Sequence, residues 1–318
     1  MNISTKREAD GRPHWRGAFA ALVTPFDRSG QLDEQALRDN LQMTVDDDAH
    51  GVMVGGQYGE GYSMSDDERR RLFEIAAETV GGRIPVIAAT GHVATAAAIE
   101  LTRSAKAAGV DGVMLDPPHY LLPKADEVVA HYSEICAAVD IPVKLCNSPG
   151  RSGFDLTPDI IERLLQIPQI VSIKHSGLDF ERIMQLRMRF GSRLDVFIGP
   201  SRTFGLAGVL HGAAGFMDGL IQVAGRRPVE LFEAAAAGDL PRAVKLQEEL
   251  FLLGEAVYTR DGTTPATTKD AMRLVGRPGG WPRAPLRPLR GAALARLEQA
   301  LRAAGVPLCQ GGASGRGG

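Results

Sequence analysis

The chain has 318 residues, of which 44% are hydrophobic and 23% are charged, as in an ordinary globular protein with a large core. Its formal net charge of -2 argues against strong attraction to nucleic acid or to an anionic membrane, so we expect neither as a partner. Three cysteines are too few for a disulfide framework and favour a reducing compartment, which predicts a cytoplasmic protein.

Both ends of the sequence are polar. Residues 1–13 lack the apolar stretch of a signal peptide, and residues 305–318 end in a glycine-rich run, so we expect two disordered tails. The sequence contains no apolar run long enough to predict a membrane-spanning helix. Its seven histidines are not spaced like metal ligands, so no metal and no other cofactor is predicted.

Between these tails, short apolar runs alternate with longer amphipathic segments. Eight runs are almost continuously apolar, which is typical of strands buried on both faces. The predicted strands are Ala18–Thr24, Gly51–Gly55, Ile84–Thr90, Gly112–Asp116, Pro142–Cys146, Ile170–Lys174, Leu194–Gly199 and Ala214–Met217. The segments between them carry apolar residues at three- and four-residue steps and predict helices. These are Asp33–Asp47, Ser65–Val80, Thr95–Ala108, Lys124–Val139, Thr157–Leu165, Asp179–Phe190 and Thr203–Leu210.

Eight successive strand–helix units favour an α/β fold, a closed (β/α)8 TIM barrel over residues 14–224. An open, doubly wound sheet is the alternative. Residues 225–304 are rich in Ala, Leu, Glu and Arg, and we expect them to form a C-terminal helical appendage. Its predicted helices are Pro228–Ala237, Leu240–Tyr258, Pro265–Leu274 and Leu289–Ala304.

Lys174 is the first candidate for chemistry, because catalytic residues of such barrels lie at the C-terminal ends of the strands. It ends the sixth predicted strand. A confined barrel mouth disfavours a charged ammonium group, and a neutral amine beside a ketone forms a Schiff base. A salt bridge at the strand end is the alternative.

Two loops could hold a substrate anion. The glycine-rich loop Gly55–Gly61 contains Gln57 and Tyr58, and its backbone N–H groups could approach a carboxylate. It matches no nucleotide-binding motif, and a tight structural turn is the alternative. Arg151, on a Pro/Gly-shaped loop after the fifth strand, could bind a carboxylate with two hydrogen bonds or form a surface salt bridge.

Five segments together resemble the dihydrodipicolinate synthase/N-acetylneuraminate lyase family of Schiff-base barrels. They are Gly17–Asp27 (GAFAALVTPFD), Gly55–Glu60 (GGQYGE), Asp116–Pro123 (DPPHYLLP), Cys146–Leu156 (CNSPGRSGFDL) and Ile170–Gly177 (IVSIKHSG). The resemblance implies that Lys174 forms the Schiff base. It also implies that Tyr120 reaches the site of a neighbouring subunit, in a homo-oligomer that is a dimer or a tetramer.

The sequence departs from this family at several site positions. The family loop usually reads GTTGE or GSTGE, and Gln57 and Tyr58 replace the two hydroxyl residues that hold the pyruvate carboxylate. Cys146 replaces the catalytic tyrosine and is either a weak acid or base or a small packing residue. The phenol of Tyr58 could occupy space near the lost tyrosine. Asp218, directly after the eighth predicted strand and next to Met217, could orient Lys174, act as a base or have a buried structural role.

These residues predict a class I lyase that acts on pyruvate or another small 2-oxo acid. Aldol cleavage, aldol condensation and dehydration of a sugar acid are all open to such a site. We expect Lys174, Cys146 and Tyr120 to be catalytic, and we expect the substrate to be bound by Gln57, Tyr58, Arg151, Met217 and Asp218. The alternatives are a true 4-hydroxy-tetrahydrodipicolinate synthase and a barrel that binds a 2-oxo acid without turnover.

Overall fold

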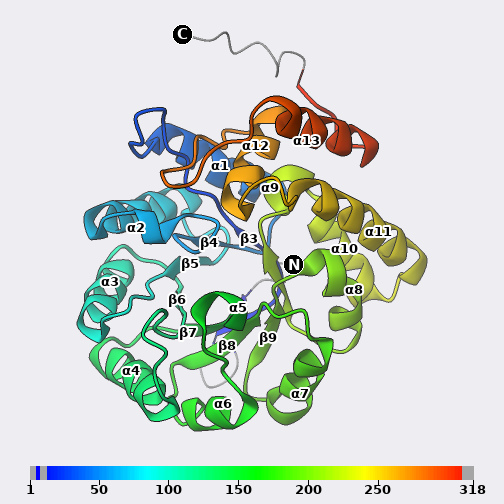
Figure 1. Cartoon of the computed structure of the whole chain (residues 1–318). Helices are drawn as coiled ribbons and strands as arrows, with labels where there is room; N and C mark the ends of the chain where they lie inside the picture. The colour runs from blue at the N-terminus through cyan, green and yellow to red at the C-terminus, as the bar shows by residue number, and fades with distance from the viewer. Residues whose placement is uncertain (1–4, 8–12, 310–318) are drawn as a thin grey trace.

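Eight parallel strands form a closed barrel in the computed structural model, which describes residues 5–7 and 13–309 (Figure 1). The strands are β3 (Gly17–Ala21), β4 (Gly51–Val54), β5 (Val86–Ala89), β6 (Gly112–Leu115), β7 (Val143–Asn147), β8 (Ile170–His175), β9 (Asp195–Ile198) and β10 (Gly215–Asp218). β10 pairs with both β3 and β9, which closes the sheet. The TIM-barrel prediction is therefore confirmed, and the open sheet is excluded.

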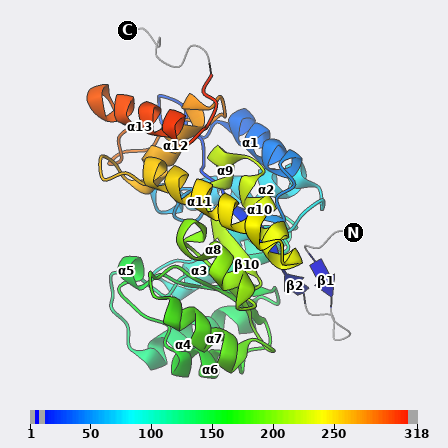
Figure 2. The ribbon, with the colours of Figure 1, turned by 90° about the vertical axis from the view of Figure 1, so that its right-hand side faces the viewer.

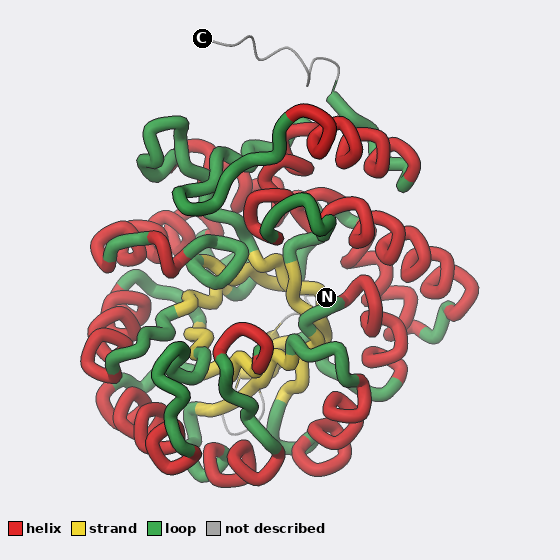
Figure 3. The backbone as a smooth tube through the Cα atoms, viewed as in Figure 1, coloured by secondary structure: helices red, strands yellow, loops and turns green. Residues whose placement is uncertain are grey.

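Helices surround these strands on the outside of the barrel (Figure 3). They are α1 (Glu34–Asp46), α2 (Asp66–Val80), α3 (Thr95–Ala107), α4 (Ala125–Ala138), α6 (Pro158–Leu164), α7 (Phe180–Phe190) and α8 (Ser201–Leu210). Each lies within a predicted helix or begins two residues before it. α2 begins with a capping box, in which Ser65 and Glu68 each accept a hydrogen bond from the other's backbone N–H.

Two short helices that the sequence analysis did not predict lie in loops after strands. They are α5 (Pro149–Ser152) and α9 (Ile221–Ala224). A helix of one turn has no apolar periodicity to reveal it. The 3-10 turn η1 (Gly61–Ser63) likewise follows the glycine-rich loop.

The remaining helices are α10 (Arg227–Ala237), α11 (Leu240–Val257), α12 (Thr264–Leu274) and α13 (Gly291–Ala303). α10 contacts α8 and β3, which is the place of the eighth helix of a barrel. The helical layer of the barrel therefore extends to Ala237, beyond the expected boundary at residue 224. α12 contacts α9 and α13 and lies with them over the same side of the barrel as α1 (Figure 1).

A small antiparallel sheet of β1 (Thr5–Arg7) and β2 (Pro13–Trp15) lies at the end of the barrel opposite α5 (Figure 2). Trp15 is buried and packs in the barrel interior with Phe19 and Phe197. Gly112 is required beside it, because a Cβ atom there would lie 2.5 Å from the indole ring. The side chain of Trp15 thus closes this end of the barrel, and the opposite end is left for a site.

The expected tails differ from the structure where residues are described. Thr5–Arg7 is a strand rather than disordered, because its backbone pairs with β2. Near the other end, Val306 is buried and the N–H of Cys309 donates to the carbonyl oxygen of Leu274. These contacts order residues 305–309. Residues 1–4, 8–12 and 310–318, the rest of the two expected tails, lie outside the described residues.

Candidate active site

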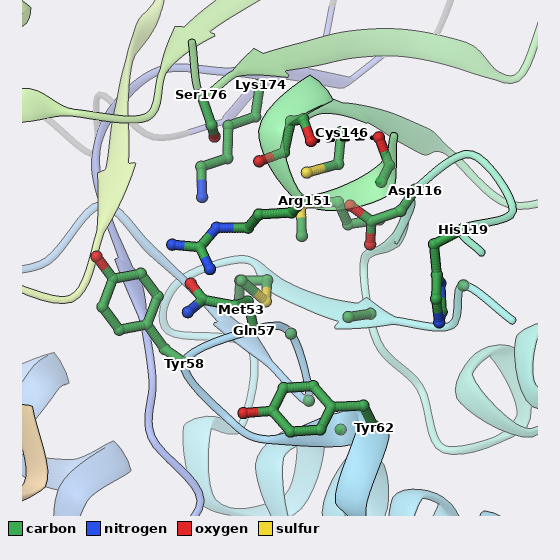
Figure 4. Close-up of a pocket in the computed structure, with 18 of the residues that line it drawn as sticks. Met53, Gln57, Tyr58, Tyr62, Asp116, His119, Cys146, Arg151, Lys174 and Ser176 are labelled. Carbon is green, nitrogen blue, oxygen red and sulfur yellow. Dashed lines mark hydrogen bonds between the residues drawn. The ribbon is translucent and has the colours of Figure 1, made fainter. Parts of the chain in front are cut away.

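A cavity of about 700 Å³ lies at the C-terminal ends of the barrel strands. Its walls come from the ends of strands β4 to β10, from the loops that follow them, and from Tyr258 at the end of α11. Clefts of this size with a few convergent polar groups are typical of small-molecule sites. Figure 4 shows the side chains of Lys174 and Arg151 pointing toward the same open space.

Lys174 lies on the wall of the cavity. It lies near the end of β8, in register with Cys146 of β7 and Phe197 of β9, and its exposed fraction is 7%. The next residue, His175, turns to the other face of the strand, where Nδ1 lies 3.3 Å from the side-chain nitrogen of Asn147. No salt bridge of Lys174 is present among the described residues, so its amine faces the cavity without a bound carboxylate.

Cys146 and Asp116 form a pair on the cavity wall. Cys146 lies in β7, directly beside Lys174 in the sheet, and its thiol lies next to the Asp116 carboxyl. Burial raises the pKa of the Cys146 thiol well above its usual value, and the negative charge of Asp116 raises it further. Cys146 is therefore a neutral thiol near neutral pH, and the geometry favours a hydrogen-bond donor over a base.

Asp218 lies on the other side of the cavity, at the end of β10. The backbone N–H of Ser201 donates to Oδ2 at 3.0 Å, and that of Leu220 donates to Oδ1 at 2.9 Å. The Ser201 hydroxyl also donates to Oδ2. Burial raises the pKa of Asp218, while these hydrogen bonds and the nearby Lys174 oppose the rise. Both oxygens thus have structural partners, which favours a role in orienting the site.

The glycine-rich loop after β4 brings Gln57 and Tyr58 to the cavity wall. The ring of Tyr58 packs on Gly219, where a Cβ atom would lie 2.4 Å from it, and its hydroxyl donates to the Tyr258 hydroxyl at 2.9 Å. Burial raises the pKa of Tyr58, so the phenol stays protonated. Tyr58 is thus held toward the end of β10.

A buried ion pair also fixes the glycine-rich loop after β4. Glu60, at φ 52°, pairs with Lys269 of α12, and both side chains are fully buried. Glu60 also accepts a hydrogen bond from the backbone N–H of Arg283 at 2.9 Å. The position of the loop that carries Gln57 and Tyr58 therefore depends on the C-terminal helices.

Arg151 lies on α5, which begins at Pro149 and is followed by Gly153 at φ 71°. Its side chain is exposed, lines the cavity and extends toward Tyr58 and Gln57 (Figure 4). No salt bridge of Arg151 occurs among the residues that the structure describes, so the surface salt bridge is not observed.

Two expected site residues do not line this cavity. Tyr120 is 90% exposed, at φ 70° in the loop after β6, and is not among the residues that line the cavity of its own chain. Met217 is fully buried among the side chains that fill the barrel interior, because it precedes the last residue of β10 and turns inward below the cavity. The structure thus gives Met217 a packing position rather than contact with a ligand.

The sequence analysis missed several cavity residues. Asp116 ends the fourth predicted strand, and the rule that selected Lys174 selects it equally well. Arg69 lies on α2 and reaches the cavity while donating to the carbonyl oxygens of Ala89 and Gly91. Tyr258 comes from a helix that no strand-end rule covers, so only the tertiary structure reveals it.

Over the described residues, no group of three or more His, Cys, Asp or Glu side chains could hold a metal ion. A search of the same part of the chain for a helix long and apolar enough to span a bilayer also finds none.

Comparison with known proteins extends these observations. The model of the dihydrodipicolinate synthetase family matches residues 14–304. An uncharacterized DapA-like lyase of Rhizobium meliloti is 35% identical over 92% of this chain and 96% of its own length. A 4-hydroxy-tetrahydrodipicolinate synthase of Halorhodospira halophila is also 35% identical, over 92% of this chain and 98% of its own.

A solved structure shows the same likeness. The dihydrodipicolinate synthase of Acinetobacter baumannii, described as chloride inhibited and complexed with pyruvate, superposes with a TM-score of 0.87 at 30% identity. The match covers 92% of this chain and 99% of that one. The barrel, its strand-end cavity and these similarities agree, and the chain belongs to the dihydrodipicolinate synthetase family and is a lyase.

Proposed function

We propose that the protein is a class I lyase that binds pyruvate or another small 2-oxo acid as a Schiff base on Lys174. The observation that carries the proposal is the position of Lys174, a nearly buried amine at the floor of a strand-end cavity without a carboxylate partner among the described residues. Pyruvate is a ligand of the related Acinetobacter baumannii enzyme, which supports a 2-oxo acid here.

The chemistry begins with attack of the Lys174 amine on the keto carbon. The nitrogen lone pair forms the C–N bond, the carbonyl π pair moves to oxygen, and a proton passes from nitrogen to that oxygen. A second proton transfer lets water leave, and the C=N bond of the iminium ion forms. This cation accepts electrons from the neighbouring carbon, so the same site serves aldol cleavage, aldol condensation and dehydration.

The surrounding side chains supply binding and orientation. Arg151 is placed to hold a carboxylate at the cavity entrance, where its guanidinium has five N–H donors to offer. Gln57 presents an amide to the same space. Asp218, fixed by three donors, holds a negative charge near Lys174 and orients it.

We also propose a cytoplasmic homo-oligomer, a dimer or a tetramer. Tyr120 carries this part of the proposal, because a tyrosine that is 90% exposed on a loop beside the cavity is suited to a neighbouring subunit. Among the described residues, Cys136, Cys146 and Cys309 are free thiols, which fits a reducing compartment. Sedimentation at working concentration tests the assembly, and a fully active monomer would contradict it.

Synthesis of 4-hydroxy-tetrahydrodipicolinate is the second candidate, because a relative that matches over 92% of this chain carries that name. The site argues against it, since Cys146, Gln57 and Tyr58 stand where the family has hydroxyl groups for proton relay and carboxylate binding. We expect turnover of pyruvate with aspartate semialdehyde to be absent or reduced by about 10²–10⁴-fold relative to an ordinary enzyme. A rate on the order of 10 per second would establish the synthase instead.

Reductive trapping tests the central proposal. Pyruvate with borohydride should leave a covalent adduct on the peptide that contains Lys174, detected by mass spectrometry. Lys174→Arg should abolish labelling, because a guanidinium stays protonated and does not attack a ketone. Lys124, at the start of α4, is the internal control and should stay unlabelled. Labelling that survives Lys174→Arg, or none with a broad set of 2-oxo acids, would favour the binding-only barrel.

A further inference from the structure

The neutral thiol of Cys146 leaves the proposed chemistry without an obvious base. Enamine formation from the iminium ion requires a group that takes a proton from the carbon next to the keto carbon. Cys146 is buried and stays protonated, and the phenol of Tyr58 is bound to Tyr258 and stays protonated too. A different side chain of the cavity must therefore accept the proton.

Asp116 has the position for this task. It follows the last residue of β6, lines the cavity and lies near enough to Lys174 for the lysine charge to act on its carboxyl. Figure 4 shows its carboxyl beside Cys146 at the edge of the open space. The strand end fixes its backbone, and the backbone N–H of Asp116 lies close against Gly91, where a Cβ atom would approach it to 3.3 Å.

Asp116 and Asp218, which both line the cavity, differ in the donors that bind their carboxyl groups. Asp218 receives two backbone N–H groups and one hydroxyl. For Asp116, the thiol of Cys146, a weak donor, lies next to the carboxyl, and no backbone N–H or hydroxyl group among the described residues donates to it. Asp116 thus keeps more lone pairs available for a substrate proton than Asp218 does.

The environment of Asp116 favours a role as a base. Burial raises the pKa of Asp116, and the neighbouring Cys146 thiol and the charges of Lys174, His119 and Arg69 oppose the rise. Tyr132 also faces it and is held protonated by burial. A carboxyl whose pKa is moved toward the working pH is a better proton acceptor and donor than an ordinary one.

We propose that Asp116 is the catalytic acid–base residue of this site and that Cys146 is a positioning residue that holds it. The inference rests on the proposed function, since it needs the iminium ion on Lys174. The carboxylate takes a proton from C3 of bound pyruvate, the C–H electron pair becomes the C2=C3 bond, and the C=N π pair returns to nitrogen. The products are a neutral enamine and protonated Asp116, which later returns a proton to carbon or to a leaving group.

Exchange of the pyruvate methyl protons in D2O tests the step without knowledge of the physiological substrate. Wild-type enzyme should catalyse the exchange, observed by NMR, and Asp116→Asn should lower the rate by about 10²–10⁴-fold. Borohydride trapping of pyruvate on Lys174 should persist in Asp116→Asn, which also shows that the variant is folded. Asp126→Asn, an equivalent change on the surface of α4, is the matched control and should leave both rates unchanged.

The pH profile and a second variant separate catalysis from structure. The wild-type exchange rate should rise with pH as Asp116 loses its proton, and that rise should be missing in the residual rate of Asp116→Asn. Cys146→Ser keeps a donor and should retain most of the exchange, whereas Cys146→Ala should lower it by a smaller factor than Asp116→Asn does.

The outcomes distinguish this inference from the function on which it rests. Trapping in Asp116→Asn with exchange within threefold of wild type would overturn the role of Asp116 and leave the Schiff-base lyase intact. Loss of trapping together with exchange would place Asp116 before the iminium ion and overturn its assignment to C3. Absence of trapping in the wild type would overturn the proposed function itself.

Discussion

Two lysines of this barrel point into its interior from neighbouring strands, and only one of them faces the cavity. Cys146 and Lys174 are partners across β7 and β8, and Lys144 and Ser172 are the partners two residues lower. Lys174 is 7% exposed and lines the cavity, whereas Lys144 is 0% exposed. Lys174 and Lys144 therefore allow a comparison of the same kind of side chain at two depths in one barrel.

Lys144 is enclosed by aromatic rings. Its Nζ lies 3.3 Å from the ring centroid of Phe197 and 5.1 Å from that of Trp15, and it donates to the hydroxyl oxygen of Ser172 at 2.6 Å. The Ser172 hydroxyl donates in turn to the carbonyl oxygen of Asp195 at 2.8 Å. Burial lowers the pKa of Lys144 well below its usual value, and the charge of Lys174 lowers it further against the opposing charge of Asp195.

The comparison teaches that access, rather than a depressed pKa, decides which lysine can react. A neutral amine is a nucleophile in principle, yet a 2-oxo acid cannot reach Lys144 through the side chains that close the barrel interior. The strand-end position of Lys174 gives it both a confined setting and an open face. Under the proposed function, the chemistry therefore takes place at the strand-end layer of the barrel interior, where Lys174 lies.

Removal of the upper lysine should produce the largest effect. Lys174→Ala should lower pyruvate methyl exchange by roughly 10³-fold or more, because loss of a covalent nucleophile removes the whole pathway. Lys144 should not take over. The measurement is NMR exchange in D2O on Lys174→Ala and on Lys174→Ala/Lys144→Met, and the two should be equal. A residual rate that disappears only in the double variant would show that Lys144 reaches the substrate.

Lys269 is a third buried lysine, and its contribution to the free energy of unfolding extends the comparison. Lys269 has a carboxylate partner, Glu60, and burial lowers the pKa of Lys269 to about 8 against the opposing charge of Glu60. Glu60→Gln should cost about 3–5 kcal/mol in the free energy of unfolding, because it leaves a buried ammonium group without its counter-charge. Urea unfolding measures the loss.

The control for this change is a carboxylate on the surface. Glu74 pairs with Arg71 and its side chain is half exposed, so Glu74→Gln should cost about 0–1 kcal/mol. Equal losses for Glu60→Gln and Glu74→Gln would mean that the buried pair contributes no more than a surface pair.

The sequence predicted the strand ends that line the cavity better than it predicted the other parts of the site, for a physical reason. Strand ends are marked by apolar runs, so Lys174 could be placed at the cavity from periodicity and chain order, whereas Cys146 and Asp218 were singled out by the family resemblance. Asp116 meets the same strand-end rule, but its position in the sequence does not show that it lies beside Cys146. Asp116 and Cys146 lie at the ends of the neighbouring strands β6 and β7, so the sequence pattern of either strand alone does not show that they are adjacent.

Other parts of the site could not be predicted from local patterns. Tyr258 and Lys269 reach the glycine-rich loop from helices more than 190 residues later in the chain, and both contacts arise from packing of the C-terminal helices on the barrel. The aromatic enclosure of Lys144 follows from barrel closure, which no pattern along β7 shows. Met217 was misplaced because its strand end was known and its depth was not.

The smallest expected effect concerns Lys144 itself, and its pH dependence distinguishes a buried amine from a catalytic one. The pKa of Lys144 is depressed in the folded state relative to 10.5, so the unfolded chain binds more protons between the two values. Stability of the wild type should therefore rise with pH across that window, by up to about 1.4 kcal/mol per pH unit for this group.

Lys144→Met fills a similar volume without a titrating group, so it should be more stable than wild type by roughly 1–2 kcal/mol at pH 7. That advantage should shrink as the pH approaches 10, as measured by urea unfolding at several pH values, while borohydride trapping on Lys174 persists. A stability difference that does not change with pH would show that Lys144 keeps its ordinary pKa in the folded protein, and the contrast between the two lysines would then reduce to access alone.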